Sequence, residues 1–74
     1  MYILQEIQTN GNVTALATPI QYPTRQAAES AFYTTCGYAV ISTVEKHTVM
    51  VYTDEGFPIP ELTKCFKHEA ESGT

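Results

Sequence analysis

Basic residues are scarce in this chain. Arginine and lysine together number four in 74 residues against eight acidic residues, so the net charge is −4 at pH 7. Binding to the phosphates of a long nucleic acid needs a basic stripe or patch, and this charge balance opposes such binding. The composition therefore predicts that long nucleic acids are not among the partners.

Long apolar stretches are absent as well. No run approaches the roughly 20 residues needed to cross a bilayer, and the first residues lack the basic start and apolar middle of a signal peptide. We therefore expect a cytoplasmic protein without membrane contact. The 43% of apolar residues suffices for a core, which predicts one small domain over residues 1 to 68 and a polar, frayed tail over residues 69 to 74.

Chemically active groups form no motif. The glycines are isolated, which excludes a glycine-rich phosphate loop. Cys36 and Cys65 are too far apart for a CxxC motif, so we expect two reduced thiols. A zinc site built from these thiols with His47 and His68 would have only one of its two knuckles, so we predict no metal and no cofactor. No serine or histidine sits in a catalytic motif, and we expect no enzymatic activity.

The first residues predict a β-hairpin. Residues 2 to 9 are rich in Ile and Tyr and end at Asn10-Gly11, a strong hairpin signal, after which a second strand returns antiparallel. Turn length sets the register. A two-residue turn places Ile7 opposite Thr14, and a three-residue turn places Ile7 opposite Ala15. The sequence leaves these two registers open.

The segment after the first hairpin has the residue spacing of a helix. Thr24 can cap a helix, and small and apolar residues then recur along one stripe through residues 27 to 36, with Phe32 as the largest. The alanines on this stripe indicate close packing on a sheet. Gly37 is placed to end the helix, because glycine readily adopts the left-handed conformation of a helix C-terminus.

The rest of the chain predicts further strands. Residues 38 to 44 and 48 to 53 are β-branched and aromatic, which predicts a second hairpin turning at residues 45 to 47. For residues 61 to 67 a short helix and an extended edge strand both fit, and the strand is slightly favoured. The predicted fold is a two-layer α+β domain in the order β-β-α-β-β, with one helix on an antiparallel sheet of four or five strands.

One helix can cover only one face of this sheet. Apolar residues of the second hairpin would alternate onto both faces, so one face would stay bare unless residues 57 to 67 fold back over it. A bare apolar face on so small a protein marks an interface. We expect a homodimer or higher oligomer, built sheet to sheet or by pairing of edge strands. The candidate interface residues are Tyr38, Val40, Val44, Val49, Val51 and Tyr52, with Ile41 and Met50 on the same face as Tyr52.

Four residues are candidates for binding a small anionic ligand. Arg25 lies in the first turn of the predicted helix, where unpaired backbone N–H groups also attract anions. Tyr33 projects from the polar side of this helix, where the core does not need it. Lys46 and His47 lie in the predicted hairpin turn. In an oligomer, neighbouring chains would together supply these side chains to one binding site. The alternative interpretation is that each of them is an ordinary solvated residue.

The layout resembles small uncharacterised proteins of bacteriophages and mobile elements of gut bacteria. The resemblance covers residues 2 to 67 and rests on the Asn-Gly hairpin, the segment TRQAAESAFY after a Pro-Thr pair, and a Val-rich strand ending in YTDEG. The sequence departs from that pattern at residues 57 to 60, where such proteins continue directly into a strand.

The resemblance implies a phage-type accessory protein in the cytoplasm of a bacterial host. Such a protein would bind and occupy a host component, for example as an inhibitor of bacterial antiviral immunity. Two alternatives remain open. One is an oligomeric sponge that sequesters a cyclic-nucleotide immune signal, and the other is a small structural oligomerisation module.

Overall fold

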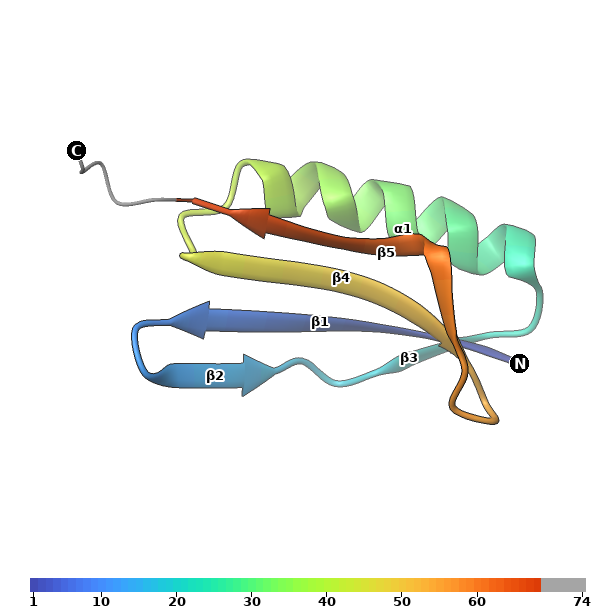
Figure 1. The fold of residues 1–74 in the computed structure, drawn as a ribbon. Coiled ribbons are helices and arrows are strands. Elements are labelled where there is room, and N and C mark those ends of the chain that lie inside the picture. The colour runs from blue at the N-terminus through green and yellow to red at the C-terminus, as the bar shows by residue number, and fades with distance from the viewer. Residues whose placement is uncertain (69–74) are drawn as a thin grey trace.

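The computed structural model describes residues 1 to 68 and shows one helix packed on one face of an antiparallel sheet (Figure 1). The sheet has the strand order β2-β1-β4-β5, with β3 pairing β1 on the same edge as β2. The predicted α+β fold is confirmed, and the predicted tail over residues 69 to 74 lies outside the described residues. The elements are β1 (Tyr2–Asn10), β2 (Val13–Leu16), β3 (Ile20–Tyr22), α1 (Arg25–Val40), β4 (Lys46–Thr53) and β5 (Pro58–Lys67).

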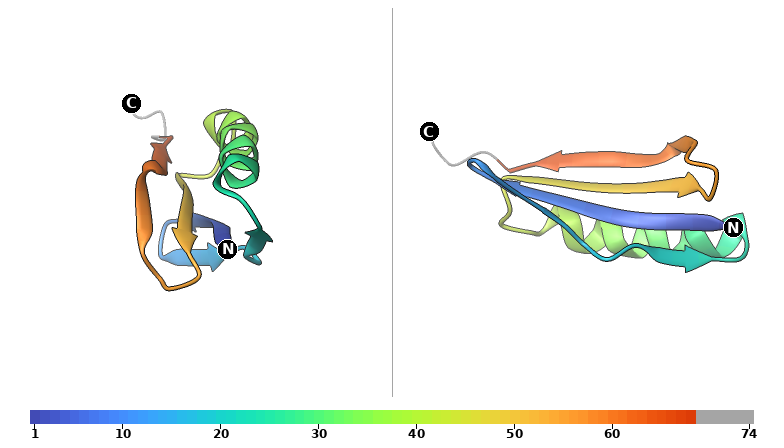
Figure 2. Two further views of the ribbon diagram at one scale, coloured as in Figure 1. Left: turned by 90° about the vertical axis from the view of Figure 1, so that its right-hand side faces the viewer. Right: turned by 90° about the horizontal axis from the view of Figure 1, so that it is seen from below.

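The molecule is elongated, with extents of 42, 21 and 18 Å along its principal axes (Figure 2). β2 and β3 lie in line along one edge, where β2 pairs with the second half of β1 and β3 with its first half. Residues 17 to 19 interrupt this edge because Pro19 has no N–H for the ladder. Gln5 Nε2 donates a hydrogen bond to the Ala17 carbonyl at 3.3 Å, which fastens the interruption to the sheet.

The first hairpin turns at Gly11 and Asn12. Asn10 pairs with Val13 and Ile7 with Leu16, so both registers expected from the sequence are wrong. Gly11 has a φ of 59° and Asn12 has no positive φ, which is the pattern of a type II′ turn with glycine in the first central position.

The turn of the first hairpin contacts the connection between α1 and β4. The Gly11 N–H donates to the Glu45 carboxylate at 2.9 Å. The Glu45 N–H in turn donates to Asn10 Oδ1 at 2.9 Å, so the Asn10 side chain binds a distant loop while its backbone belongs to β1. The hairpin turn is therefore fixed by residues far away in the sequence.

The helix begins as predicted and ends later than predicted. Thr24 Oγ1 accepts a hydrogen bond from the Ala27 N–H at 3.2 Å, which confirms the N-cap. The prediction that Gly37 ends the helix is wrong, because α1 continues to Val40. The extra turn places Ala39 at 0% exposure on the stripe that holds Phe32. Burial on this stripe offsets the cost of roughly 0.5–1 kcal/mol for glycine inside a helix.

Gly37→Ala is expected to raise the free energy of unfolding by about 0.5–1 kcal/mol. Gly37 has no positive φ, and a Cβ added there would meet nothing within 4 Å. Urea unfolding measures the change. Gly56→Ala is the matched control and should destabilise, because Gly56 has a φ of 93°. Destabilisation by Gly37→Ala would contradict the open space and ordinary helical backbone at this residue.

The predicted strand over residues 38 to 44 is wrong. Residues 38 to 40 are the last turn of α1, and residues 41 to 45 form the connection to β4. β4 therefore does not pair with this segment and lies between β1 and β5 instead. Lys46 and His47, expected in a turn, are the first residues of β4.

The predicted edge strand at the C-terminal end is confirmed as β5. It pairs only with β4, which leaves its outer edge open. Its two prolines are tolerated because an edge strand needs no N–H donors on its open side. The register shifts between Met50, which pairs with Thr63, and Tyr52, which pairs with Pro58. β5 bends sharply there (Figure 1), and both Ile59 and Leu62 are buried. Because β5 extends the sheet sideways, the alternative in which residues 57 to 67 fold back over the bare face is wrong.

The core lies between α1 and the sheet. Phe32 is its largest fully buried side chain, followed by Leu62 of β5. Alternate residues of β1 and β4 reach the same layer, since Leu4 pairs with Val51 and both are buried. The core consists of Leu4, Ala28, Phe32, Ala39, Val49, Val51, Ile59 and Leu62.

Candidate interaction surface

The sheet face away from α1 carries a group of apolar side chains, which we call the open face. Side chains alternate along a strand, and Leu4 and Val51 point to the core, so the residues next to them point the other way. In the register, Ile3 pairs with Tyr52 and Ile7 pairs with Leu16. The apolar residues of the open face are Ile3, Ile7, Leu16, Met50 and Tyr52.

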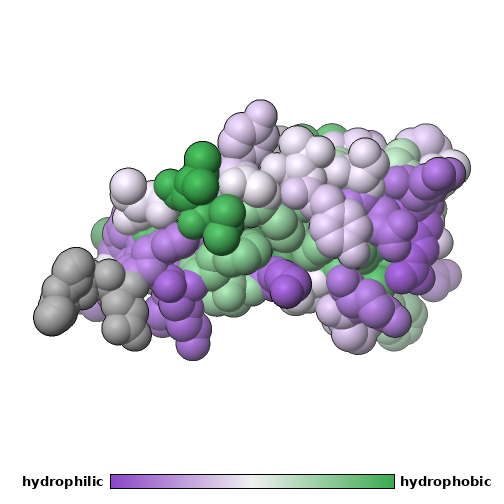
Figure 3. Space-filling view, turned by 90° about the horizontal axis from the view of Figure 1, so that it is seen from above, coloured by the Kyte–Doolittle hydropathy of each residue, from purple (hydrophilic) through white to green (hydrophobic). Residues whose placement is uncertain are grey.

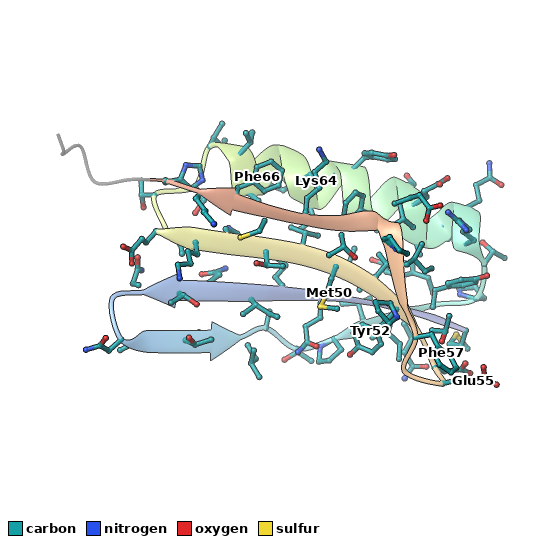
Figure 4. The ribbon with its side chains drawn as sticks, in the orientation of Figure 1. Met50, Tyr52, Glu55, Phe57, Lys64 and Phe66 are labelled. Atoms are coloured by element: carbon teal, nitrogen blue, oxygen red, sulfur yellow. The ribbon has the colours of Figure 1, made fainter. Side chains whose placement is uncertain are left out.

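Exposure on the open face is graded. Leu16 is 66% exposed at the edge, and the others on β1 and β4 are half-buried by their neighbours in the sheet. Figure 4 shows Met50 and Tyr52 along β4, and Lys64 and Phe66 on the side of β5 toward α1. No element of residues 1 to 68 lies across the open face, since α1 is on the other side and β5 is in the sheet.

Neutral polar groups and two lysines complete the open face. The Tyr52 hydroxyl donates to Gln5 Oε1 at 3.1 Å, and the hydroxyls of Thr9 and Thr14 lie 3.1 Å apart. At one end Lys46 of β4 pairs directly with Lys67 of β5, and both are exposed. Like charges directly opposite each other in a sheet are destabilising. An acidic group from a partner would relieve this repulsion.

His47 was expected in a turn and is instead 5% exposed in β4. Its side chain is on the helix side of the sheet, the same side as that of Val49, which lies two residues further along β4. His47 Nε2 is 2.8 Å from Glu6 Oε1, so the ring donates to this carboxylate, and its Nδ1 has no hydrogen-bond partner among residues 1 to 68. His47 is thus a structural residue of the core in this chain.

The other three candidate ligand residues are not brought together. Arg25, at the start of α1, lies 3.9 Å from carboxylate oxygens of both Glu29 and Glu61. Tyr33 is 62% exposed on the outer side of α1. Lys46 starts β4 just after the other end of the helix, so the long axis of the molecule separates it from Arg25 (Figure 1).

The candidate interface residues are also scattered. Val49 and Val51 are fully buried beneath α1 and offer no surface to a partner. Val44 is half-buried in the connection after α1. Tyr52 alone lies on the open face, beside Met50. The period-two spacing of Ile3 and Ile7 in β1 is the sequence signal that could have identified more of this face.

A second exposed apolar group lies at the end of α1. Tyr38, Val40 and Ile41 are 68%, 52% and 76% exposed. Ile41 follows the helix rather than lying on a strand, so its predicted place beside Met50 is wrong. Residues 30 to 44 carry no charge. Figure 3 shows this face: pale and green surface follows the helix toward the C-terminal side, and hydrophilic surface gathers at its start.

Neither cysteine is in a disulfide. Cys36 packs against the core from α1, and burial raises the pKa of its thiol above the ordinary value while the nearby Lys64 charge acts in the opposite direction. Cys65 is exposed on β5, next to Thr48 in the register.

Residues 1 to 68 contain no pocket and no group of three or more His, Cys, Asp or Glu arranged to hold a metal ion. The helix in this part of the chain is neither long nor apolar enough to span a membrane. Comparisons of the chain with protein-family models, curated proteins and solved structures give no match.

Proposed function

We propose that this protein is a non-catalytic binding module that occupies a protein partner through the open face. The observation that supports the proposal is the set of apolar residues on this face, which neither α1 nor β5 covers. An apolar sheet face of this kind, half-buried within the sheet and covered by no other element of residues 1 to 68, is suited to interaction with a partner. Met50 and Tyr52 suit such a role, because Met adapts to irregular surfaces and Tyr combines a broad ring with a hydroxyl.

The chemistry of the open face indicates what the partner presents. Apolar side chains of the partner would cover Ile3, Ile7 and Met50. Acidic side chains would lie at the end where Lys46 and Lys67 face each other, since these two like charges stand opposite each other in the sheet. Charge complementarity at the rim of an interface mainly increases association rate and specificity.

The resemblance to phage and mobile-element proteins suggests that the partner is a host protein of the bacterial cytoplasm, and inhibition of antiviral immunity is the leading hypothesis. A cyclic-nucleotide sponge has less support. Arg25 and Lys46 lie at opposite ends of one chain, and Arg25 is already close to two carboxylates. A sponge would need a second chain to complete every pocket.

The test compares Met50→Lys with Tyr33→Lys for capture from bacterial lysate and for the affinity of the purified partner. Met50→Lys places a charge within the apolar surface and should weaken binding about tenfold or more. Tyr33→Lys adds the same charge to the outer side of α1 and should change binding little. Far-UV circular dichroism checks that both variants remain folded.

The lysine pair provides a second readout of the same experiment. Lys46→Gln and Lys67→Gln should slow association and reduce its dependence on salt, because the acidic groups of the partner lose their attraction. Equal retention of the partner by the wild type and Met50→Lys would contradict the proposal, as would loss of binding in Tyr33→Lys alone.

A further inference from the structure

The two edges of the sheet differ in how they are protected against pairing with another strand. The β5 edge carries two prolines and the charged residues Glu61, Lys64 and Lys67, which are typical guards of an exposed edge. The opposite edge falls in residues 7 to 24, which contain no charged residue. β2 itself contains neither charge nor proline, and all its residues are exposed.

β2 also projects beyond the helix. α1 contacts β1, β3, β4 and β5 but not β2, so both faces of this strand are open (Figure 1). Val13 and Leu16 are 70% and 66% exposed. They point to opposite faces, since they stand three residues apart in a strand. A partner lying on one face would cover only one of them, whereas a strand added beside β2 would flank both.

The backbone of β2 has free hydrogen-bonding groups at this edge. The Ala17 N–H donates to the Glu6 carbonyl at 3.0 Å, and alternate residues of an antiparallel strand bond to the same neighbour. Ala15 and Val13 therefore bond to β1. Thr14 and Leu16 direct their N–H and C=O groups to the free edge.

We infer that β2 pairs antiparallel with β2 of a second copy of this chain, across a two-fold axis beside Ala15. In this register Thr14 lies opposite Leu16 of the other copy, and the free N–H and C=O groups of these two residues satisfy each other. A two-fold contact places the same patch against itself. Because each chain carries a net charge of −4, an uncharged edge is the contact that avoids repulsion between copies.

The pairing has a geometric consequence. A two-fold axis perpendicular to the sheet keeps both open faces on one side and both helices on the other. The joined sheet then presents the open face twice to one partner, which raises avidity when the partner has two sites. The inference does not depend on the proposed function, because it uses the strand edge and leaves the open face uncovered.

The test uses amide hydrogen exchange of the wild-type chain together with sedimentation over a range of concentrations. We expect a species of twice the 8.2 kDa chain mass at high concentration. The amides of Thr14 and Leu16 should gain about tenfold or more protection as the dimer forms, since they then donate to another strand. Protection in β5 should not change with concentration.

Ala15→Lys supplies the variant test, because it places two ammonium groups next to each other at the axis. It should weaken the dimer about tenfold or more and leave the monomer folded, since Ala15 is exposed. Thr34→Lys puts the same charge on an exposed position of α1 and is the matched control. A chain that stays at 8.2 kDa at every concentration overturns the inference. So does a dimer in which the Thr14 and Leu16 amides exchange as fast as in the monomer.

Discussion

Phe32→Ala is expected to lower the free energy of unfolding by about 3–5 kcal/mol. Phe32 is 0% exposed and is the largest fully buried side chain among the described residues. Its removal leaves a cavity between α1 and the central strands, which the small alanines of the helix cannot fill. A domain of this length has a total stability of roughly 4–11 kcal/mol. The variant should therefore be partly or largely unfolded in buffer, as measured by far-UV circular dichroism and urea titration.

Tyr33→Ala is the matched control, because it removes the adjacent aromatic ring from the outer side of the same helix. Tyr33 is 62% exposed and its ring centroid is 5.3 Å from that of Phe32 in an edge-to-face arrangement. Loss of this pair should cost about 0.5–1.5 kcal/mol. If the two variants lost equal stability, the core would not be centred on Phe32.

The elements that the sequence predicted well are those decided by local chemistry. Thr24 caps the helix through its own hydroxyl, and Phe32 lies on a stripe that periodicity reveals directly. The C-terminal edge strand is favoured only slightly over a short helix, because Pro58 and its neighbours exclude a central strand without excluding a helix. For the helix start and for Phe32, residues within one or two turns carry the whole signal.

The errors concern features that distant residues decide. Residues 38 to 44 have high β-propensity, yet the helix continues because Ala39 becomes buried under the sheet. The first hairpin turns at Gly11 rather than Asn10. Both residues form hydrogen bonds with Glu45, which follows the C-terminal end of the helix. Neither contact can be seen from the local sequence.

The candidate surface shows the same division. The sequence contains only one helix, which predicts that one face of the sheet stays bare. The structure leaves that face open over residues 1 to 68. Which residues occupy it depends on strand pairing. Val49 and Val51 belong to the core because Leu4 pairs with Val51 beneath α1, whereas Met50 and Tyr52 take the other face. Strand order and register were needed to choose between the two sets.

His47→Ala is expected to lower the free energy of unfolding by about 1–3 kcal/mol. The His47 side chain is buried in β4, and its Nε2 donates to Glu6 Oε1 at 2.8 Å. The substitution removes this hydrogen bond, opens space at the end of the core and leaves the Glu6 carboxylate, which is 29% exposed, without its partner. Urea unfolding of the wild type and variant measures the loss.

A double-mutant cycle separates the hydrogen bond from packing. If the pair contributes, His47→Ala and Glu6→Ala together should cost less than the sum of the single variants, because each alone already breaks the bond. Lys46→Ala is the control, since it truncates the exposed neighbour on the same strand and should stay within about 0.5 kcal/mol of the wild type. Additive losses from His47 and Glu6 would show that His47 stabilises the chain through packing alone. A loss from Lys46→Ala as large as that from His47→Ala would contradict the expectation that the buried side chain, and not its exposed neighbour on β4, carries the stability.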